Sequence, residues 1–135
     1  VVDMQFSMPF SAAIALAHGK AGLNEYAVGV PERPEIRDLM AKVKCVADPE
    51  LDSTFPKQWR AWAEVDTTDG RNLRSDVTYP KGDAQNGLTW DEMKQKFNDL
   101  TGPVISPERQ SEIIETIEAL DTLDDVRQLA SLLAT

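Results

Sequence analysis

Side chains that could perform catalysis or bind a metal are few in this sequence. His18 is the only histidine and Cys45 the only cysteine, and they lie far apart in the chain. A protein zinc site needs three or four such ligands at characteristic spacing, so this pair does not predict one. His18 precedes Gly19 at the expected end of a helix, where the helix dipole favours a cationic imidazole without any further role. Glycine-rich nucleotide-binding motifs and nucleophile motifs are also missing.

Two pairs of nearby carboxylates have structural explanations. Asp66 and Asp69 flank a predicted hairpin, whereas Asp124 and Asp125 precede a predicted helix, where acidic side chains cap the helix or complement its dipole. Trp62 falls on the polar face of a predicted strand and is a candidate contact residue, although sheet packing is the simpler role. The residues taken alone predict no self-contained active site.

The charge of the chain argues against a nucleic-acid partner. The formal net charge is −9, from 23 acidic and 14 basic residues, whereas affinity for nucleic acids comes mainly from neutralising phosphates. Residues 106–135 carry seven acidic side chains against two arginines. An acidic helical face of this kind is typical of a solvated surface.

The cysteine content and the hydropathy pattern favour a cytoplasmic protein with no membrane partner. A single cysteine excludes an internal disulfide and is typical of a reducing compartment. No apolar run approaches the ~18 residues that a membrane span needs. The apolar N-terminal stretch lacks a basic leading region and contains Asp3, so we interpret it as mature structure and not as a signal peptide.

Hydrophobic periodicity predicts helices and a small sheet in the first part of the chain. Helices are expected over residues 9–18, ending before Gly19, and over residues 34–43, opening at Pro34. Apolar and polar residues alternate over residues 42–48, 59–67 and 71–79, as in half-buried strands. An Asp69-Gly70 pair between the last two segments indicates a hairpin turn.

The remaining residues are predicted to be helical after a loop over residues 79–87. Thr89 and Glu92 form a capping box for a helix that carries Met93, Phe97 and Leu100 on one face. Further helices are expected from Ser106 to a break near residue 121, and over residues 123–133. The fold class predicted is α+β: a small antiparallel sheet of about three strands covered by helices, followed by C-terminal helices.

Two stretches of the sequence resemble a known enzyme family. The first is VDMQFSMPFSAAIALAHG, residues 2–19, and the second is YPKGDAQNGLTWDEMKQKF, residues 79–97. Both are similar to segments of the MmgE/PrpD family, the group of 2-methylcitrate dehydratase and aconitate decarboxylase. In the second stretch the matching positions are Pro80, Gly82, Asp83, Asn86, Leu88, Thr89, Glu92, Met93, Lys96 and Phe97. The intervening helix, strand and hairpin occur in the expected order, so the resemblance covers nearly the whole chain.

The resemblance implies a fragment of a two-domain lyase or isomerase. Residues 1–105 would be the smaller α+β lid domain, and residues 106–135 would be helices that return to a large N-terminal helical domain outside this chain. Family members act on small polycarboxylic acids such as 2-methylcitrate or cis-aconitate, by dehydration, decarboxylation or epimerisation, and no metal or organic cofactor is expected. Their chemistry removes a proton next to a carboxylate, with histidine and lysine residues that come mostly from the helical domain. The fragment alone is therefore expected to be inactive.

The resemblance also selects candidate substrate-binding residues. These are Gln5, Ser7, Phe10, Lys81, Gly82 and Asp83. Many relatives carry a tyrosine at the position of Phe10, whose ring cannot form a hydrogen bond. The loop also departs from the family pattern, since Gln85 and Gly87 replace expected prolines.

Simpler roles compete with the proposed site residues, and another class of function remains open. Helix entry and capping explain Gln5 and Ser7, and a solvated loop lysine explains Lys81. The whole chain could instead be a stand-alone, non-catalytic binding or regulatory domain with the same fold. In that case its C-terminal helices would cover their own apolar faces or form a homodimer.

Overall fold

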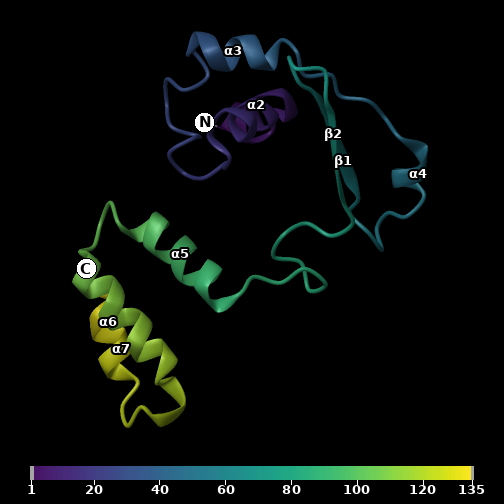
Figure 1. Cartoon of the computed structure of the whole chain (residues 1–135). Helices are drawn as coiled ribbons and strands as arrows, with labels where there is room; N and C mark the ends of the chain where they lie inside the picture. The colour runs from purple at the N-terminus through teal and green to yellow at the C-terminus, as the bar shows by residue number, and fades with distance from the viewer. Residues whose placement is uncertain (1, 135) are drawn as a thin grey trace. The chain divides into compact units, whose positions relative to one another are not determined.

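The computed structural model describes residues 2–134 and divides the chain into two compact units, Val1–Asn86 and Gly87–Thr135 (Figure 1). The first unit contains α1 (Val2–Gln5), α2 (Met8–His18), α3 (Pro34–Met40), α4 (Pro49–Asp52), β1 (Ala61–Asp66) and β2 (Asn72–Val77). The second contains α5 (Trp90–Thr101), α6 (Pro107–Glu118), a 3-10 turn η1 (Leu120–Thr122) and α7 (Arg127–Leu133). The predicted α+β class is confirmed. Across residues 2–134 no helix is long and apolar enough to cross a membrane.

Helices α2 and α3 enclose the core of the first unit. The Ser7 side chain caps α2, Pro9 occupies its first turn, and Gly19 ends it. Helix α3 begins at Pro34, as predicted, but ends at Met40. The buried core residues are Phe10, Ala13 and Ile14 from α2, Val30 from the connecting loop and Ile36 from α3. The predicted helices therefore form where expected, and they pack against each other.

The sheet is a two-stranded antiparallel hairpin (Figure 1). Ala61 lies opposite Val77 and Asp66 opposite Asn72, and the turn between the strands contains Gly70 at a φ of +85°. That left-handed conformation is open to glycine and explains the Asp-Gly pair in the sequence. The hairpin prediction is confirmed. The strands are shorter than predicted, and every residue of β2 is exposed, so no helix closes that strand's faces.

The third predicted strand, residues 42–48, is wrong. No strand is assigned there, and most of the segment is exposed, with only Val43 and Asp48 half-buried. Alternating apolar residues indicate a strand only where a neighbouring strand supplies hydrogen bonds, and none pairs with this segment. Asp48 instead accepts the Glu50 N–H at 3.0 Å and caps the short helix α4, which the sequence analysis did not predict.

The second unit is built from α5, α6, η1 and α7. The predicted Thr89–Glu92 capping box is present at the start of α5. In α6, Ile113 is buried, and the buried amide of Gln110 donates to the Asn98 carbonyl at 2.9 Å and to Thr101 Oγ1 at 2.8 Å. These bonds tie α6 to the C-terminal end of α5.

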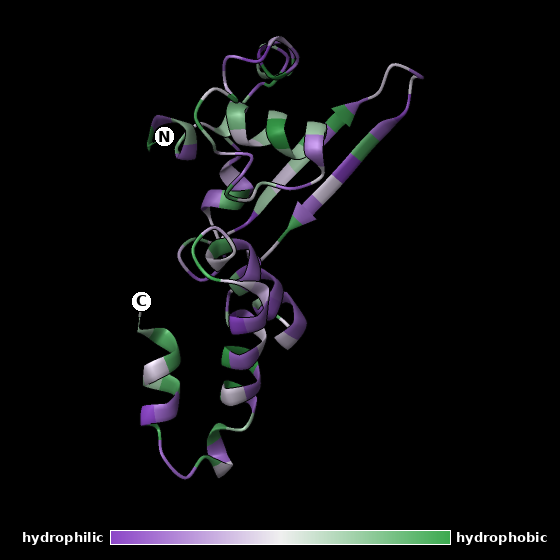
Figure 2. Cartoon of the chain, turned by 90° about the vertical axis from the view of Figure 1, so that its left-hand side faces the viewer, coloured by the Kyte–Doolittle hydropathy of each residue, from purple (hydrophilic) through white to green (hydrophobic). Residues whose placement is uncertain are grey.

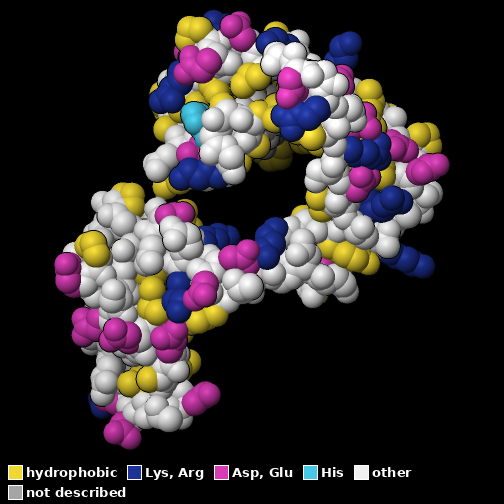
Figure 3. Space-filling model, in the orientation of Figure 1, with side chains coloured by type: hydrophobic (Ala, Val, Ile, Leu, Met, Phe, Trp, Pro, Cys, Tyr) yellow, Lys and Arg dark blue, Asp and Glu magenta, His cyan; other side chains and the backbone are white. Residues whose placement is uncertain are grey.

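The last helix of the second unit is shorter than predicted. The predicted break near residue 121 is present as η1, but α7 begins only at Arg127. Arg109 of α6 holds the end of α7, because its guanidinium donates to the Leu132 carbonyl at 2.9 Å. Figure 3 shows many acidic side chains over α6 and α7, as the sequence predicts for residues 106–135.

The boundary predicted at residues 105/106 concerns how full-length relatives are built. The division at Asn86–Gly87 instead follows the packing of this chain alone. The 105/106 boundary therefore stays a prediction.

Candidate functional site

The N-terminal candidate residues lie where α1 passes into α2. Gln5 is exposed at the end of α1. Ser7 is half-buried, and its hydroxyl accepts the Phe10 N–H at 3.2 Å. One turn further on, the hydroxyl groups of Ser11 and Tyr26 lie 2.8 Å apart and fix the start of α2 to the following loop. The Ser7 hydroxyl is thus used in capping, and the Gln5 amide is open to solvent.

Phe10 lies in the core of the first unit. Its side chain is buried, and its ring meets the ring of Tyr26 edge-on with 5.5 Å between centroids. An aromatic ring enclosed in this way fixes the helix on its surroundings and does not face solvent. Phe10 therefore anchors the start of α2 in the core, and its direct contact with substrate stays a prediction.

The second group of candidates lies in a tight loop over residues 79–86. Gly82 has a φ of +95°, a conformation that favours glycine, and its N–H donates to the Asn86 carbonyl at 2.8 Å. Asp83 Oδ1 accepts the Gln85 N–H at 2.9 Å, and the Asn86 side chain donates to the Tyr79 carbonyl at 2.8 Å. These bonds order the loop although Gln85 stands where relatives are expected to carry proline.

Chemically, this loop carries one cationic and one acidic side chain, Lys81 and Asp83. Lys81 is exposed, and the half-buried Asp83 carboxylate accepts a backbone N–H inside the loop. An ammonium group in an ordered loop suits a substrate carboxylate. No hydrogen bond in the described part of the chain joins Gln5 or Ser7 to Gly82 or Asp83, so the structure shows two separate groups of candidates.

A cluster around Trp62 was only partly foreseen. The Trp62 indole N–H donates to Asp48 Oδ2 at 2.8 Å, and the Arg74 guanidinium lies 4.8 Å from the centre of the Trp62 ring. Arg74 in turn pairs with Glu64 and Asp76, at 2.8 Å in each case. The sequence showed Trp62 on the polar face but not Asp48, which comes from outside the hairpin.

Ionisation in the Trp62 cluster follows these contacts. The Trp62 hydrogen bond lowers the pKa of Asp48 from its ordinary 3.8, and the Glu50 backbone N–H adds to this effect. The hydrogen bonds that Arg74 donates to Asp76, and then to Glu64, raise the pKa of Arg74. Both groups stay ionised at neutral pH, and each already has its own partners: Asp48 accepts from Trp62, and Arg74 donates to Glu64 and Asp76. These contacts stabilise the hairpin.

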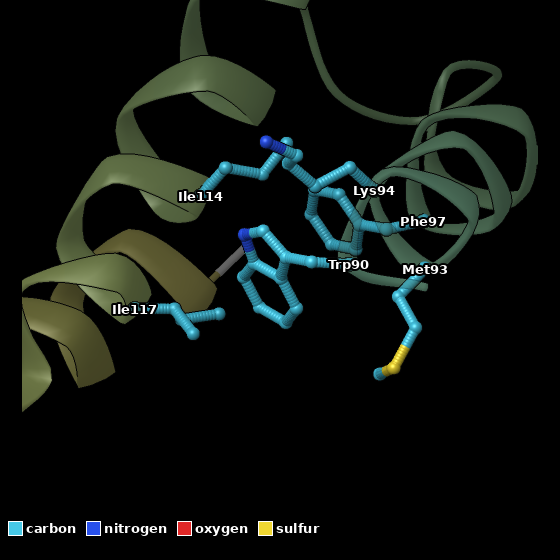
Figure 4. Close-up of a pocket in the computed structure, with 6 residues that line it drawn as sticks. All are labelled: Trp90, Met93, Lys94, Phe97, Ile114 and Ile117. Carbon is cyan, nitrogen blue, oxygen red and sulfur yellow. The ribbon is translucent and has the colours of Figure 1, made fainter. Parts of the chain in front are cut away.

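An apolar groove lies between α5 and α6 in the second unit. It measures about 160 Å³ and is lined by Trp90, Met93, Lys94, Phe97, Ile114 and Ile117. Figure 4 shows the Trp90 indole directed from α5 toward Ile114 and Ile117 on α6. At the rim, the indole N–H donates to Glu118, and Lys94 Nζ lies 3.2 Å from the same carboxylate. Both donors lower the pKa of Glu118, and the hydrogen bond from Trp90 has the larger effect.

Within residues 2–134 the structure places no three histidine, cysteine or acidic side chains where they could hold a metal ion together. The candidate residues therefore offer hydrogen bonds, one lysine and an ordered loop. Groups of these kinds are suited to anionic ligands, and the role of the candidate residues in substrate binding stays a prediction.

Comparison with known proteins confirms the resemblance noted in the sequence. Residues 1–122 match the family model described as the MmgE/PrpD C-terminal domain. The chain is also similar to the cis-aconitate decarboxylase-like protein oryM of Aspergillus oryzae, with 27% identity over 130 residues. That similarity covers 96% of this chain and 27% of the relative, so the chain spans only part of the relative's length. Because the family match extends over most of its residues, the chain belongs to the MmgE/PrpD family, in which it corresponds to the C-terminal domain.

Proposed function

We propose that this chain serves as the lid domain of an MmgE/PrpD-type lyase or isomerase acting on small polycarboxylic acids such as 2-methylcitrate or cis-aconitate. The observation that carries the proposal is the match of residues 1–122 to the C-terminal domain of the family. The name of the similar Aspergillus protein supports a carboxylic acid as the substrate class.

The reaction begins with removal of a proton next to a carboxylate, which requires a positioned base and cations facing the enolate that forms. This chain contributes the ordered loop over residues 79–86, with Lys81 facing a substrate carboxylate. Gln5 and Ser7 add polar contacts at the start of α2, which Phe10 holds in place from the core. The base comes from the helical domain of the full-length enzyme, and closure of the lid excludes water from the reacting atoms.

The first experiment compares the isolated chain with a fusion. Purified chain is incubated with 2-methylcitrate or cis-aconitate, and product is followed by proton NMR. We expect no turnover, because the base lies outside the chain. Turnover by the 135 residues alone would contradict the proposal that they act only as a lid.

The second arm restores a complete enzyme. The residues of the Aspergillus relative that precede its matched region are fused to this chain, and the same substrates are offered. We expect turnover, with Lys81→Gln raising KM and Lys57→Gln, a loop lysine elsewhere, leaving it unchanged. A folded fusion without activity on either acid would instead favour a stand-alone binding or regulatory domain.

A further inference from the structure

Among residues 2–134, no strand pairs with the outer edge of β2. β2 pairs with β1 on one side only, and its six residues are all exposed. Figure 2 shows the hairpin extending away from the neighbouring helices, with hydrophobic and hydrophilic positions along both strands. An open edge is a template for another strand, and a hairpin of two strands is only marginally stable by itself. This edge is therefore a surface on which a further strand would stabilise the sheet.

The register of the hairpin fixes which backbone groups face that edge. Thr67 donates its N–H to the Arg71 carbonyl at 2.9 Å, so this is a hydrogen-bonded pair of the antiparallel ladder. Such pairs alternate along a hairpin, so residues 73, 75 and 77 turn their N–H and C=O groups toward β1. The backbone groups of Asn72, Arg74 and Asp76 consequently face the open edge.

The sequence of β2 is complementary to itself when two copies run antiparallel. With Ser75 opposite Ser75 of a second copy, Arg74 faces Asp76, and Leu73 faces Val77. In this register Arg74 and Asp76 are also the residues whose outward N–H and C=O groups can bond to each other. We infer that a second copy of this chain docks on the β2 edge and forms a four-stranded antiparallel sheet, with a two-fold axis at Ser75.

The side chains on the two faces of this larger sheet agree with the same register. On one face Leu73 already lies beside Val65 of β1. The second copy places its Val77 on the other side of Leu73, so the apolar row continues across the interface. On the opposite face Arg74, now paired within its own hairpin, gains the Asp76 of the second copy as a neighbour. Opposite charges therefore meet twice, once on each side of the axis.

The β2 edge is the more open of the two edges. On β1, Trp62 and Val65 are half-buried, and Asp48 from the preceding segment holds the Trp62 indole. A different occupant of the β2 edge would be residues 42–48 of the same chain, added as a third strand. That arrangement would not depend on protein concentration, which separates it from a second copy.

Mass in solution tests the inference. Light scattering after gel filtration should show the 135-residue chain approaching twice its 15.0 kDa mass as concentration rises. Arg74→Asp and Asp76→Arg should each remain at 15.0 kDa, because each places like charges opposite each other. An equimolar mixture of the two should recover the doubled mass, since each strand then meets its complement. Asp38→Arg, an exposed charge reversal on α3, is the control and should behave as the unmodified chain.

Circular dichroism shows whether each variant keeps its hairpin. If one does not, hydrogen exchange of the unmodified chain tests the inference instead. The amides of Arg74 and Asp76 should become protected as concentration rises, whereas those of Leu73 and Val77 should be protected throughout. A chain that stays monomeric at every concentration would overturn the inference. So would a dimer unaffected by the two reversals, or edge protection that is already complete in dilute solution.

Discussion

Replacing Phe10 and Phe6 by alanine compares two identical chemical changes four positions apart in the sequence. The Phe10 side chain is 1% exposed, within a cluster formed by Ala13, Ile14, Val30 and Ile36, whereas Phe6 is 84% exposed. Truncating a buried phenylalanine removes its transfer free energy and leaves a cavity, which together cost about 3–5 kcal/mol. The edge-on contact with Tyr26 is lost as well. Native domains have about 5–15 kcal/mol of stability in total, so Phe10→Ala should bring the first unit close to unfolding.

Phe6→Ala should change the free energy of unfolding by less than about 0.5 kcal/mol, as is usual for exposed positions. Urea unfolding followed by far-ultraviolet circular dichroism measures both changes from the shift in midpoint at constant slope. Equal losses for the two variants would refute the assignment of Phe10 to the core. A larger loss for Phe6 would show that this ring is covered in solution, and the account of the N-terminal segment would then be wrong.

Two predictions concern the second unit. Thr89→Ala removes the side-chain half of the capping box, in which Thr89 Oγ1 accepts the Glu92 N–H, and should destabilise α5 by about 1 kcal/mol, measured as a lower thermal midpoint, whereas Thr89→Ser should preserve most of it. Glu118 has a pKa below its ordinary 4.5 because Trp90 and Lys94 donate to its carboxylate, so its ionised form stabilises the folded state. That stabilisation is complete above 4.5 and is lost as the pH falls through the lowered pKa, so thermal midpoints should drop on acidification. Glu118→Gln should flatten this pH dependence, and Glu115→Gln on the same helix should not; identical pH profiles for both variants would contradict the role of Glu118.

Sequence alone predicted the elements that carry their own start and stop signals. Helix α5 has Thr89 and Glu92 at its start, and the hairpin has Gly70 at its turn, so both were found in place. Residues 42–48 show a strand-like alternation but no strand, because pairing depends on a neighbour that local sequence does not encode. The four-residue helix α4 was missed for a related reason, since it carries too few residues for any periodicity.

In the candidate site, too, local features could be predicted from the sequence and tertiary contacts could not. The cap at Ser7 follows from local sequence and is present in the structure, whereas the left-handed conformation of Gly82 was not among the sequence predictions. Burial of Phe10 depends on Val30 and Ile36, which are distant in the chain, so a family comparison could suggest the position but not its surroundings. The link from Asp48 to Trp62 is likewise a tertiary contact between segments with no shared pattern.

The sparse interior of the second unit has a consequence for its dynamics. Among the described residues of this unit, Ile113 is the one apolar side chain that is buried. Opening of α5 away from α6 therefore exposes little additional apolar surface. The free energy of such an opening is set by buried area, and regions with few buried contacts open at low cost without unfolding their neighbours. Backbone amides of α5 and α6 should then exchange with solvent deuterium faster than those of α2, even under fully native conditions. The backbone amides of the first unit are then better protected from exchange than those of the second. The C-terminal helices are therefore the part of the chain whose conformation a binding partner can most easily change.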